Sequence, residues 1–408
     1  MSLDSVVIAG AGQAGLQVAA SLRQEGFQGA ITLVGDEPGL PYQRPPLSKA
    51  YLLGKIGLAN LQFRPESFFA EQRVTLLHDS VSAIDRTNRR VTLASGAALD
   101  YGHLVLAVGA HNRMLPVPGA ELDGVFGIKT LADADTLAPR LKDVKNVVVV
   151  GAGFIGLEFA AVASALGANV HVLEMGDRPM ARAISHEMSD AFSAAHKSWG
   201  VHLDFRQALS RIEGDNGKVC GVETSDGRRL PADLVVFGIG VIPNVKLAVE
   251  AGLDVDNGIK VDANLLTHDP AISAIGDVAS FPSHFVERHI RLESVQNAMD
   301  QARVVAARLM GKSAPYGALP WFWTDQRDLK LQIVGLNDGY DDTVVLRGEA
   351  QQMTVLCFRR GQLVAVETLN RPGDHMVGRK LLARPCQLTP QLASAADFDL
   401  KAYELATR

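Results

Sequence analysis

Residues 4–24 read "DSVVIAGAGQAGLQVAASLRQ", an apolar run that breaks at glycines and resumes with a helical pattern. The apolar run is typical of a strand buried on both faces. Gly10, Gly12 and Gly15 follow at GxGxxG spacing, and a second apolar run ends at Asp36. A strand, a glycine turn, a helix and a second strand with an acid about twenty residues beyond the glycines predict a βαβ unit that binds a dinucleotide.

The three glycines and the acid have separate physical roles in such a unit. The first glycine permits the tight turn, the second lets backbone N–H groups approach a pyrophosphate, and the third lets the helix pack closely on the strand. The helix N-terminus faces the phosphate charge, and the acid accepts hydrogen bonds from a ribose. The alternative is a glycine-rich turn in a sheet that binds no ligand.

Residues 145–167, "KNVVVVGAGFIGLEFAAVASALG", repeat the whole pattern. Gly151, Gly153 and Gly156 have the same spacing, and the next apolar run ends at Glu174. Two such units predict two dinucleotides. A flavoprotein that takes hydride from a nicotinamide cofactor needs this arrangement, with one site for FAD and one for NAD(P)H. The alternative is an internal duplication in which one site has lost its ligand.

The composition excludes several classes of protein. A chain of 408 residues with net charge −5 predicts two or three domains and no nucleic-acid partner. Cys220, Cys357 and Cys386 form no CxxC pair, which argues against a disulfide framework, a zinc ribbon or a local redox dithiol. The eleven histidines form no HExxH pattern, so no metal site is expected. We expect no signal peptide and no membrane span, and therefore a cytoplasmic protein.

A third signal is the run "PAISAIGDVAS" at residues 270–280, which breaks at Gly276 and Asp277. Here the chain resembles the FAD-dependent pyridine nucleotide reductases, whose second FAD motif ends a strand in this GD pair. Residues 104–110 ("LVLAVGA") and 234–244 ("LVVFGIGVIPN") match two further strand ends of that family, with Val108 where threonine is usual. The resemblance implies that the first glycine turn holds FAD and the second holds the nicotinamide cofactor.

Further motifs narrow the resemblance to one group of these enzymes. They are "RPPLSK" at 44–49, "KTLADAD" at 129–135, "ESVQNAMDQAR" at 293–303 and "WFWTDQRDLKLQIVG" at 321–335. As a set they resemble the NADH:ferredoxin reductases of haem-monooxygenase and ring-dioxygenase systems, of the putidaredoxin reductase and rubredoxin reductase type, which lack the redox cysteines of the wider superfamily.

The resemblance implies a glutathione-reductase-like α/β fold with two Rossmann-like FAD/NAD(P)-binding domains and a C-terminal α+β interface domain. The expected FAD domain is discontinuous, over residues 1–113 and 245–315. The NAD domain is expected over 114–244 and the C-terminal domain over 316–408. Strands at "LKLQIVGL", "DTVVLRG" and "MTVLCFRRGQLVAVETL", followed by two helical runs, support the last assignment.

The family pattern also implies which residues contact each cofactor. Those expected at FAD, bound tightly but not covalently, are Gly10, Gly12, Ala14, Gly15, Asp36, Arg44, Lys49, Val81, Ala107, Gly109, Lys129, Gly276, Asp277, Glu293, Ser294, Val295 and Trp323. Those expected at the nicotinamide cofactor are Gly151, Gly153, Phe154, Ile155, Gly156, Glu158, Glu174, Arg182, Gly238, Ile239 and Gly240.

Lys49 and Glu158 are the candidate catalytic residues. By resemblance, the proline-stiffened loop that carries Lys49 lies against the flavin, and Glu158 pairs with this lysine beside flavin N5. The lysine would stabilise charge on the reduced flavin, and the glutamate would compensate the desolvation of the lysine. The alternatives are a solvated surface lysine and a glutamate that only complements the helix dipole.

Glu174 bears on the choice between NADH and NADPH. A carboxylate at this strand end accepts a hydrogen bond from the ribose 2′-hydroxyl and repels a 2′-phosphate. Arg178 and Arg182 lie just beyond and offer an arginine to that phosphate. Because the acid is in the diagnostic place, the sequence favours NADH.

Because the loop after the first βαβ unit contains no cysteine, electrons are expected to leave the flavin directly, without a thiol relay. The expected partner is an acidic two-iron ferredoxin in a transient complex with a monomer or weak dimer of this chain. Arg64 and Arg303 are the candidate docking residues, with Arg327 and Lys330 as weaker candidates. The alternatives are a rubredoxin reductase, an NADH oxidase, and a flavin-bound redox sensor resembling apoptosis-inducing factor.

Overall fold

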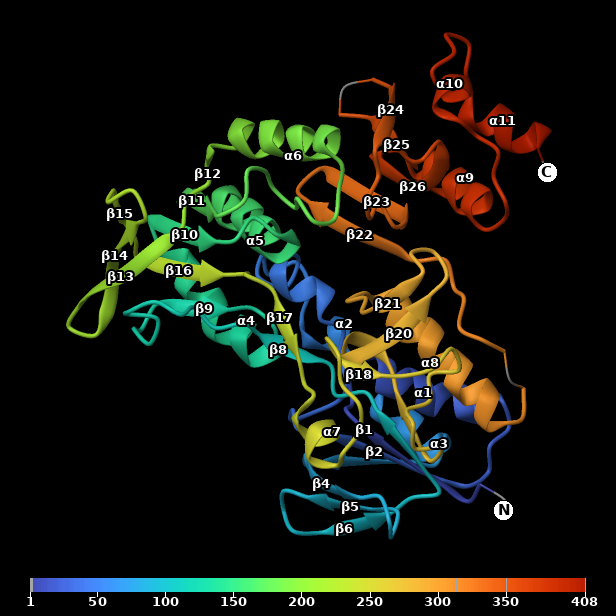
Figure 1. The fold of residues 1–408 in the computed structure, drawn as a ribbon. Coiled ribbons are helices and arrows are strands. Elements are labelled where there is room, and N and C mark those ends of the chain that lie inside the picture. The colour runs from blue at the N-terminus through green and yellow to red at the C-terminus, as the bar shows by residue number, and fades with distance from the viewer. Residues whose placement is uncertain (1–2, 313, 350, 408) are drawn as a thin grey trace. The chain divides into compact units, whose positions relative to one another are not determined.

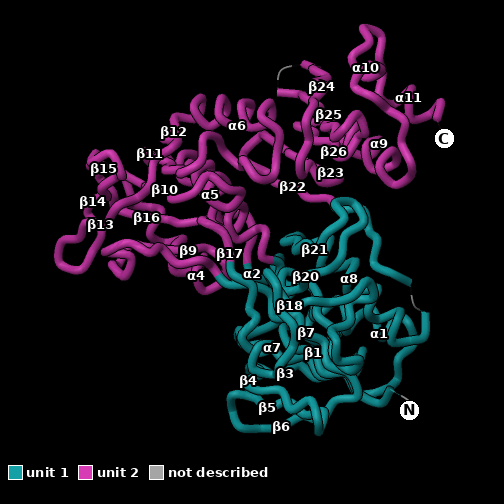
Figure 2. Tube along the Cα trace, in the orientation of Figure 1, with its two compact units in different colours: residues 1–43, 58–111, 242–320 teal, residues 44–57, 112–241, 321–408 magenta. Residues whose placement is uncertain are grey.

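The computed structural model describes residues 3–312, 314–349 and 351–407. The chain folds into two compact units, each built from three segments of sequence (Figure 2). Unit 1 contains residues 1–43, 58–111 and 242–320, and unit 2 contains the segments between and after them: 44–57, 112–241 and 321–408.

Unit 1 is built on a five-stranded parallel sheet (Figure 1). Its strand order is β19 (Ile272–Ala274), β7 (His103–Leu106), β1 (Ser5–Ala9), β2 (Ala30–Gly35) and β3 (Val74–His78). Helix α1 (Gln13–Gln24) connects β1 to β2, and α8 (Val295–Leu309) packs on α1 from far along the chain. The central strands are buried, as the apolar runs predict.

Smaller elements complete unit 1. Two three-stranded sheets contain β4 (Val81–Asp85), β5 (Arg90–Leu93) and β6 (Ala98–Asp100), and β18 (Ile259–Lys260), β20 (Ala279–Ser283) and β21 (Arg288–Ile290). The short helices are α2 (Leu58–Leu61), α3 (Glu66–Glu71), η3 (Gly276–Val278) and α7 (Lys246–Glu250).

Unit 2 contains a second parallel sheet of five strands. Its order is β12 (Val201–Phe205), β11 (Asn169–Glu174), β10 (Asn146–Val150), β16 (Leu234–Phe237) and β9 (Val125–Gly127). The helices of this part are α4 (Leu131–Leu137), η2 (Ala138–Lys142), α5 (Phe154–Ala165) and α6 (His186–Ser198). An antiparallel sheet joins β13 (Leu209–Asp215), β14 (Lys218–Thr224) and β15 (Arg229–Pro231).

The C-terminal part of unit 2 is an antiparallel sheet followed by three helices. The sheet order is β22 (Trp321–Gln326), β23 (Leu329–Gly335), β26 (Gln362–Leu369), β25 (Met353–Arg359) and β24 (Asp342–Arg347). The helices are α9 (Pro372–Leu382), α10 (Pro390–Ala393) and α11 (Leu400–Ala406). Strand β22 was not predicted from the sequence.

The segment 44–57, which contains η1 (Pro45–Ser48), belongs by its contacts to unit 2, although it lies between two segments of unit 1 in the sequence. The short strands β8 (Ala110–Asn112) and β17 (Val241–Pro243) stand where the chain passes between the units. The predicted α/β class with two parallel sheets is confirmed. The division into three domains stays a prediction.

Candidate cofactor sites and a buried ion pair

In the first glycine turn, two glycines have no room for a side chain, whereas the middle one faces open space. Gly10 has φ +108°, and a Cβ there would lie 2.3 Å from the carbonyl oxygen of Ala107. A Cβ on Gly15 would lie 1.9 Å from the carbonyl oxygen of Gly10. A Cβ on Gly12, the N-cap of α1, would meet no atom within 4 Å. The helix N-terminus is therefore approachable beside Gly12, which suits the phosphates of a dinucleotide.

The GD pair lies next to this turn. Gly276 has φ +71°, and a Cβ on it would come 3.1 Å from the Cβ of Ala14 in the first turn of α1. The Gly276 N–H donates to Gln301 Oε1 on α8 over 2.7 Å, which fixes the approach of the pair. Asp277 thus follows directly from a residue packed against α1, and Asp36 is exposed just after β2.

The N-terminus of α8 provides three more of the predicted FAD residues. Ser294 is the N-cap and accepts a hydrogen bond from the Asn297 N–H over 3.1 Å, and Val295 is the first helical residue. Glu293 pairs with Arg291 at 2.7 Å. The predicted FAD residues of unit 1 are Gly10, Gly12, Ala14, Gly15, Asp36, Val81, Ala107, Gly109, Gly276, Asp277, Glu293, Ser294 and Val295.

Four predicted FAD residues belong instead to unit 2: Arg44, Lys49, Lys129 and Trp323. Arg44 Nη1 donates to the Lys129 carbonyl oxygen over 2.7 Å, so two of these residues are in direct contact. Trp323 lies 5.4 Å from Trp321 between ring centroids. Their contact with a flavin stays a prediction.

The second glycine turn has the same construction as the first. Gly151 has φ +99°, and a Cβ there would lie 2.7 Å from the carbonyl oxygen of Gly238, at the end of β16. A Cβ on Gly156 would lie 2.1 Å from the Gly151 carbonyl oxygen. At Gly153, the N-cap of α5, a Cβ would meet the Gly238 oxygen at an unstrained 3.7 Å. This turn therefore also leaves its helix N-terminus accessible, with Ile155 39% exposed beside it.

The Glu174 carboxylate is held by the backbone at this turn. Its Oε2 accepts from the Ala152 N–H and its Oε1 from the Gly176 N–H, each over 2.7 Å. Arg178 is occupied elsewhere, because its Nη1 donates to the Ile184 carbonyl oxygen and to Ser189 Oγ over 2.9 and 2.6 Å. Arg182 is exposed, with Nη2 3.9 Å from the Cβ position of Gly240. Of the two arginines, Arg182 is therefore the accessible one.

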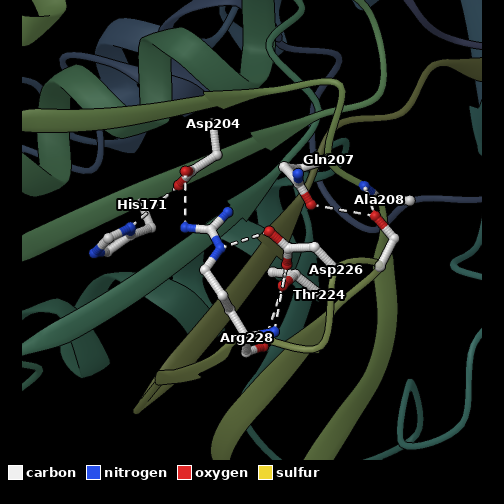
Figure 3. A network of polar contacts seen from close by, with 8 residues as sticks. His171, Asp204, Gln207, Ala208, Thr224, Asp226 and Arg228 are labelled. Carbon is white, nitrogen blue, oxygen red and sulfur yellow. Dashed lines mark hydrogen bonds and ion pairs between the residues drawn. The ribbon is translucent and has the colours of Figure 1, made fainter.

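A polar network joins β11, β12 and the turn between β14 and β15 (Figure 3). Arg228 bridges Asp204 at 3.1 Å and Asp226 at 2.9 Å, and His171 on β11 lies 3.4 Å from Asp204. The chain after β12 then returns to β11, because the Gln207 N–H donates to the Glu174 carbonyl oxygen over 2.9 Å. This last hydrogen bond holds the backbone at Glu174.

The predicted pair of Lys49 and Glu158 is present. Lys49 Nζ lies 2.9 Å from Glu158 Oε1, and the Glu158 side chain is only 4% exposed. The same carboxylate accepts hydrogen bonds from Ser48 Oγ over 2.5 Å and from Thr324 Oγ1 over 2.6 Å. Burial raises the pKa of Glu158, whereas the Lys49 ammonium and the two hydroxyls favour its ionised form.

The loop that carries Lys49 is anchored at several points in unit 2. Besides the contacts to Glu158 and the Arg44 bond to Lys129, the Tyr51 hydroxyl donates to Asp135 Oδ1 on α4 over 2.5 Å. The loop therefore presents Lys49 from a fixed backbone.

Sequence reasoning gave no role to Ser48 or Thr324, although both lie inside quoted motifs. Ser48 directly precedes Lys49, and Thr324 follows Trp323 on β22. The aromatic residues and threonine of "WFWT" were the available signal for a strand, and in a strand Thr324 and Gln326 share one face. Both side chains are buried.

The candidate docking arginines differ in their surroundings. Arg64 and Arg303 are exposed; Arg64 stacks on Phe68, and Arg303 pairs with Asp300 at 2.8 Å. Arg327 is exposed as well; it donates to Ser164 Oγ over 2.8 Å and stacks on Trp199. All three arginines are thus accessible, and their role in docking stays a prediction.

Within the described ranges, no group of three or more histidine, cysteine, aspartate or glutamate side chains is arranged to hold a metal ion. In the same ranges, no helix has the length and apolar character needed to cross a bilayer.

The model of the pyridine nucleotide-disulphide oxidoreductase family matches residues 4–302, and that of the reductase C-terminal domain matches residues 321–404. The chain belongs to the pyridine nucleotide-disulphide oxidoreductase family. Membership implies the use of a nicotinamide nucleotide and a flavin, and the open glycine turns at Gly12 and Gly153 fit two such ligands.

The similar proteins are named as reductases of rhodocoxin, putidaredoxin and ferredoxin. Rhodocoxin reductase from Rhodococcus erythropolis is 50% identical over 97% of this chain and 93% of its own length. Putidaredoxin reductase from Pseudomonas putida is 41% identical over 98% and 96%. The crystal structure of the ferredoxin reductase for the CYP199A2 system from Rhodopseudomonas palustris has a TM-score of 0.96 and 51% identity, covering 98% of this chain and 99% of that one.

Proposed function

We propose that this chain is an FAD-dependent NADH:ferredoxin reductase. It passes electrons to a two-iron ferredoxin that supplies a haem monooxygenase or a ring-hydroxylating oxygenase. The observation that carries the proposal is the combination of two open glycine turns with an ion pair, Lys49–Glu158, in place of a dithiol. Residues 37–57 contain no cysteine, so no thiol stands where a disulfide reductase would need one.

When bound, FAD accepts hydride from the nicotinamide and releases electrons one at a time. The first turn binds the FAD pyrophosphate at the N-terminus of α1, and the second binds that of NADH at the N-terminus of α5. Lys49 supplies a positive charge held at a fixed place by Glu158, and it stabilises negative charge that develops on reduction.

NADH is the proposed nicotinamide cofactor. The Glu174 carboxylate is fixed by two backbone N–H groups, so its charge faces the ribose without rearrangement. Arg178 donates to groups of its own segment and is not available to a 2′-phosphate. Arg182 is the accessible arginine, and its charge opposes the preference that Glu174 sets.

An acidic ferredoxin is the proposed partner, in a transient complex. The name of one relative supports this class, since the Sphingomonas protein at 43% identity is named a ferredoxin–NAD(P)⁺ reductase. Arg64 and Arg303 are the proposed docking residues, because both are exposed cations. Complementary charge speeds encounter and weakens with salt. Ferredoxin reduction is therefore expected to slow as salt rises, while NADH-to-ferricyanide turnover changes little.

The test is NADH-driven reduction of a panel of two-iron ferredoxins, rubredoxin and oxygen by the purified yellow holoprotein. We expect the highest kcat/KM with a two-iron ferredoxin. Faster reduction of rubredoxin would instead favour the alternative that two relatives suggest, the rubredoxin–NAD⁺ reductases at 38% identity. A flavin that NADH leaves oxidised under argon would contradict both.

A further inference from the structure

The buried Glu158 carboxylate is shared between two segments far apart in sequence. Ser48 and Lys49 reach it from the 44–57 loop, and Thr324 reaches it from β22. Thr324 is fully buried and Ser48 is 1% exposed. A hydroxyl from the C-terminal part of unit 2 therefore completes the contacts of the Lys49–Glu158 pair.

Two further buried residues stand behind Thr324. Gln326, also on β22, places its Nε2 3.5 Å from Thr324 Oγ1, and its Oε1 lies 2.7 Å from His196 Nε2 on α6. Gln326 is 1% exposed and His196 is fully buried. His196, Gln326, Thr324 and Glu158 thus form a chain of polar side chains that joins α6, β22 and α5.

The hydrogen bonds of this chain run in one direction. Burial lowers the pKa of His196 to about 4, so the ring is neutral at neutral pH. Because Gln326 Oε1 accepts, His196 carries its hydrogen on Nε2 and the Gln326 amide N–H faces Thr324. The single Thr324 hydroxyl hydrogen then points to Glu158. With the Gln326 amide turned over, two oxygens would face each other across this gap.

We propose that Thr324, oriented by Gln326 and His196, is a positioning residue that keeps Glu158 ionised and thereby holds the Lys49 ammonium in place. The proposal rests on the proposed function for the role of Lys49 beside the flavin. The ionisation of Glu158 itself is measurable without NADH or ferredoxin.

The directed chain disfavours a protonated Glu158. An ionised carboxylate only accepts, which matches donation from Lys49, Ser48 and Thr324. A carboxyl protonated on Oε1, the oxygen that Thr324 contacts, would have to donate there, and the Thr324 hydroxyl hydrogen would then turn toward the Gln326 amide N–H. Hydrogen bonds donated to a buried carboxylate favour its ionised form.

The experiment is an infrared pH titration of the buried carboxyl in the full-length holoprotein, with the Glu158 band assigned by its loss in Glu158→Gln. In Thr324→Val, the midpoint for protonation of Glu158 should rise by about one to two pH units, because one hydrogen bond to the charged form is lost. Thr324→Ser should restore the wild-type midpoint. The flavin midpoint potential should change in the valine variant, because the charges of Glu158 and Lys49 both act on it, and should recover in the serine variant.

Thr343→Val is the matched control. Thr343 Oγ1 donates to Glu187 Oε1 over 2.6 Å, so it too joins a strand of the C-terminal sheet to a glutamate on a helix of the second parallel sheet. Loss of the Thr343–Glu187 hydrogen bond should lower the free energy of unfolding about as much as Thr324→Val does, without changing the midpoint for protonation of Glu158. A structural effect common to both threonines would move the midpoint in both variants.

Gln326→Leu keeps the Thr324 hydroxyl and removes the group that orients it, so a smaller rise in the same direction is expected. This variant tests the chain if Thr324→Val fails to fold. An unchanged Glu158 midpoint in both Thr324→Val and Gln326→Leu would overturn the proposal. A protein that shows the predicted midpoints but reduces no two-iron ferredoxin would contradict the proposed function alone.

Discussion

The two glycine turns have the same backbone and different surroundings. Gln17 and Glu158 each stand two residues after the third glycine of their turn. Gln17 Nε2 donates to Ser21 Oγ one helical turn along α1. Glu158, by contrast, is contacted by two segments outside its helix, the 44–57 loop and β22. The GxGxxG spacing therefore determines the shape of a binding turn. The polar contacts at the helix that follows come from residues in other parts of the chain.

The variants Gly12→Ala and Gly153→Ala are expected to show the largest difference between the two turns, because each should weaken the binding of a different cofactor. A Cβ at either position meets no close protein atom, so the free energy of unfolding should change by less than about 1 kcal/mol. Each Cβ enters the space proposed for a pyrophosphate. Gly12→Ala should weaken flavin binding about 10- to 100-fold, while Gly153→Ala should keep its flavin and raise KM for NADH by a similar factor.

Flavin absorbance after gel filtration and steady-state NADH kinetics measure the two effects. Loss of flavin from Gly153→Ala, with flavin retained by Gly12→Ala, would reverse the assignment of the two turns.

Glu158→Gln and Gln17→Ala compare equivalent helix positions. Glu158→Gln leaves Lys49, which is 17% exposed, without its counter-charge, and should lower the free energy of unfolding by about 2–4 kcal/mol. Gln17→Ala removes one hydrogen bond within a helix and should cost less than about 1 kcal/mol. Urea denaturation measures both, and equal losses would show that the covering of α5 adds nothing.

The two glycine turns could be predicted from the sequence, because each is specified by residues close together in the chain. GxGxxG spacing between an apolar run and a helical pattern specifies β1–α1 and β10–α5, because a side chain at the first or third glycine would clash with backbone within or beside the same turn. The Lys49–Glu158 pair was reached through the family pattern. Thr324 and Gln326 were missed because their role depends on β22 packing against α5, a contact between residues about 160 positions apart that no local pattern encodes. Arg178 looked available in sequence and is occupied in the fold.

Buried carboxylates extend the contrast between the units. Among the described residues, the buried acidic side chains are Glu158, Glu367 and Glu404, all in unit 2. Glu367 accepts from the Ser185 N–H and hydroxyl at the N-cap of α6 over 2.9 and 2.6 Å, and burial raises its pKa from 4.5 to about 7.

The raised pKa of Glu367 gives a signed prediction. Between pH 4.5 and 7 the folded state binds a proton that the unfolded state has released, so stability falls as pH rises through this window and levels off above it. The total change should be about 3–4 kcal/mol, and Glu367→Gln should flatten it. Trp199, Trp321 and Trp323 all lie in unit 2, so tryptophan fluorescence in urea reports this unit. An unchanged slope in the variant would assign the pH dependence to other groups.

The smallest expected effect compares the acids that end the second strand of each βαβ unit. Glu174→Gln keeps an oxygen for a backbone N–H and removes the charge, so it should raise the NADPH/NADH ratio of kcat/KM about tenfold by ending repulsion of a 2′-phosphate. Glu174→Ala should raise the ratio too. It should also lower stability, because the Ala152 and Gly176 N–H groups lose their acceptor. Asp36→Asn, at the first turn, should leave the ratio unchanged, because that turn is proposed to hold FAD. If Asp36→Asn changed the ratio and Glu174→Gln did not, nicotinamide selection would belong to the first turn, and the two units would have to exchange their proposed ligands.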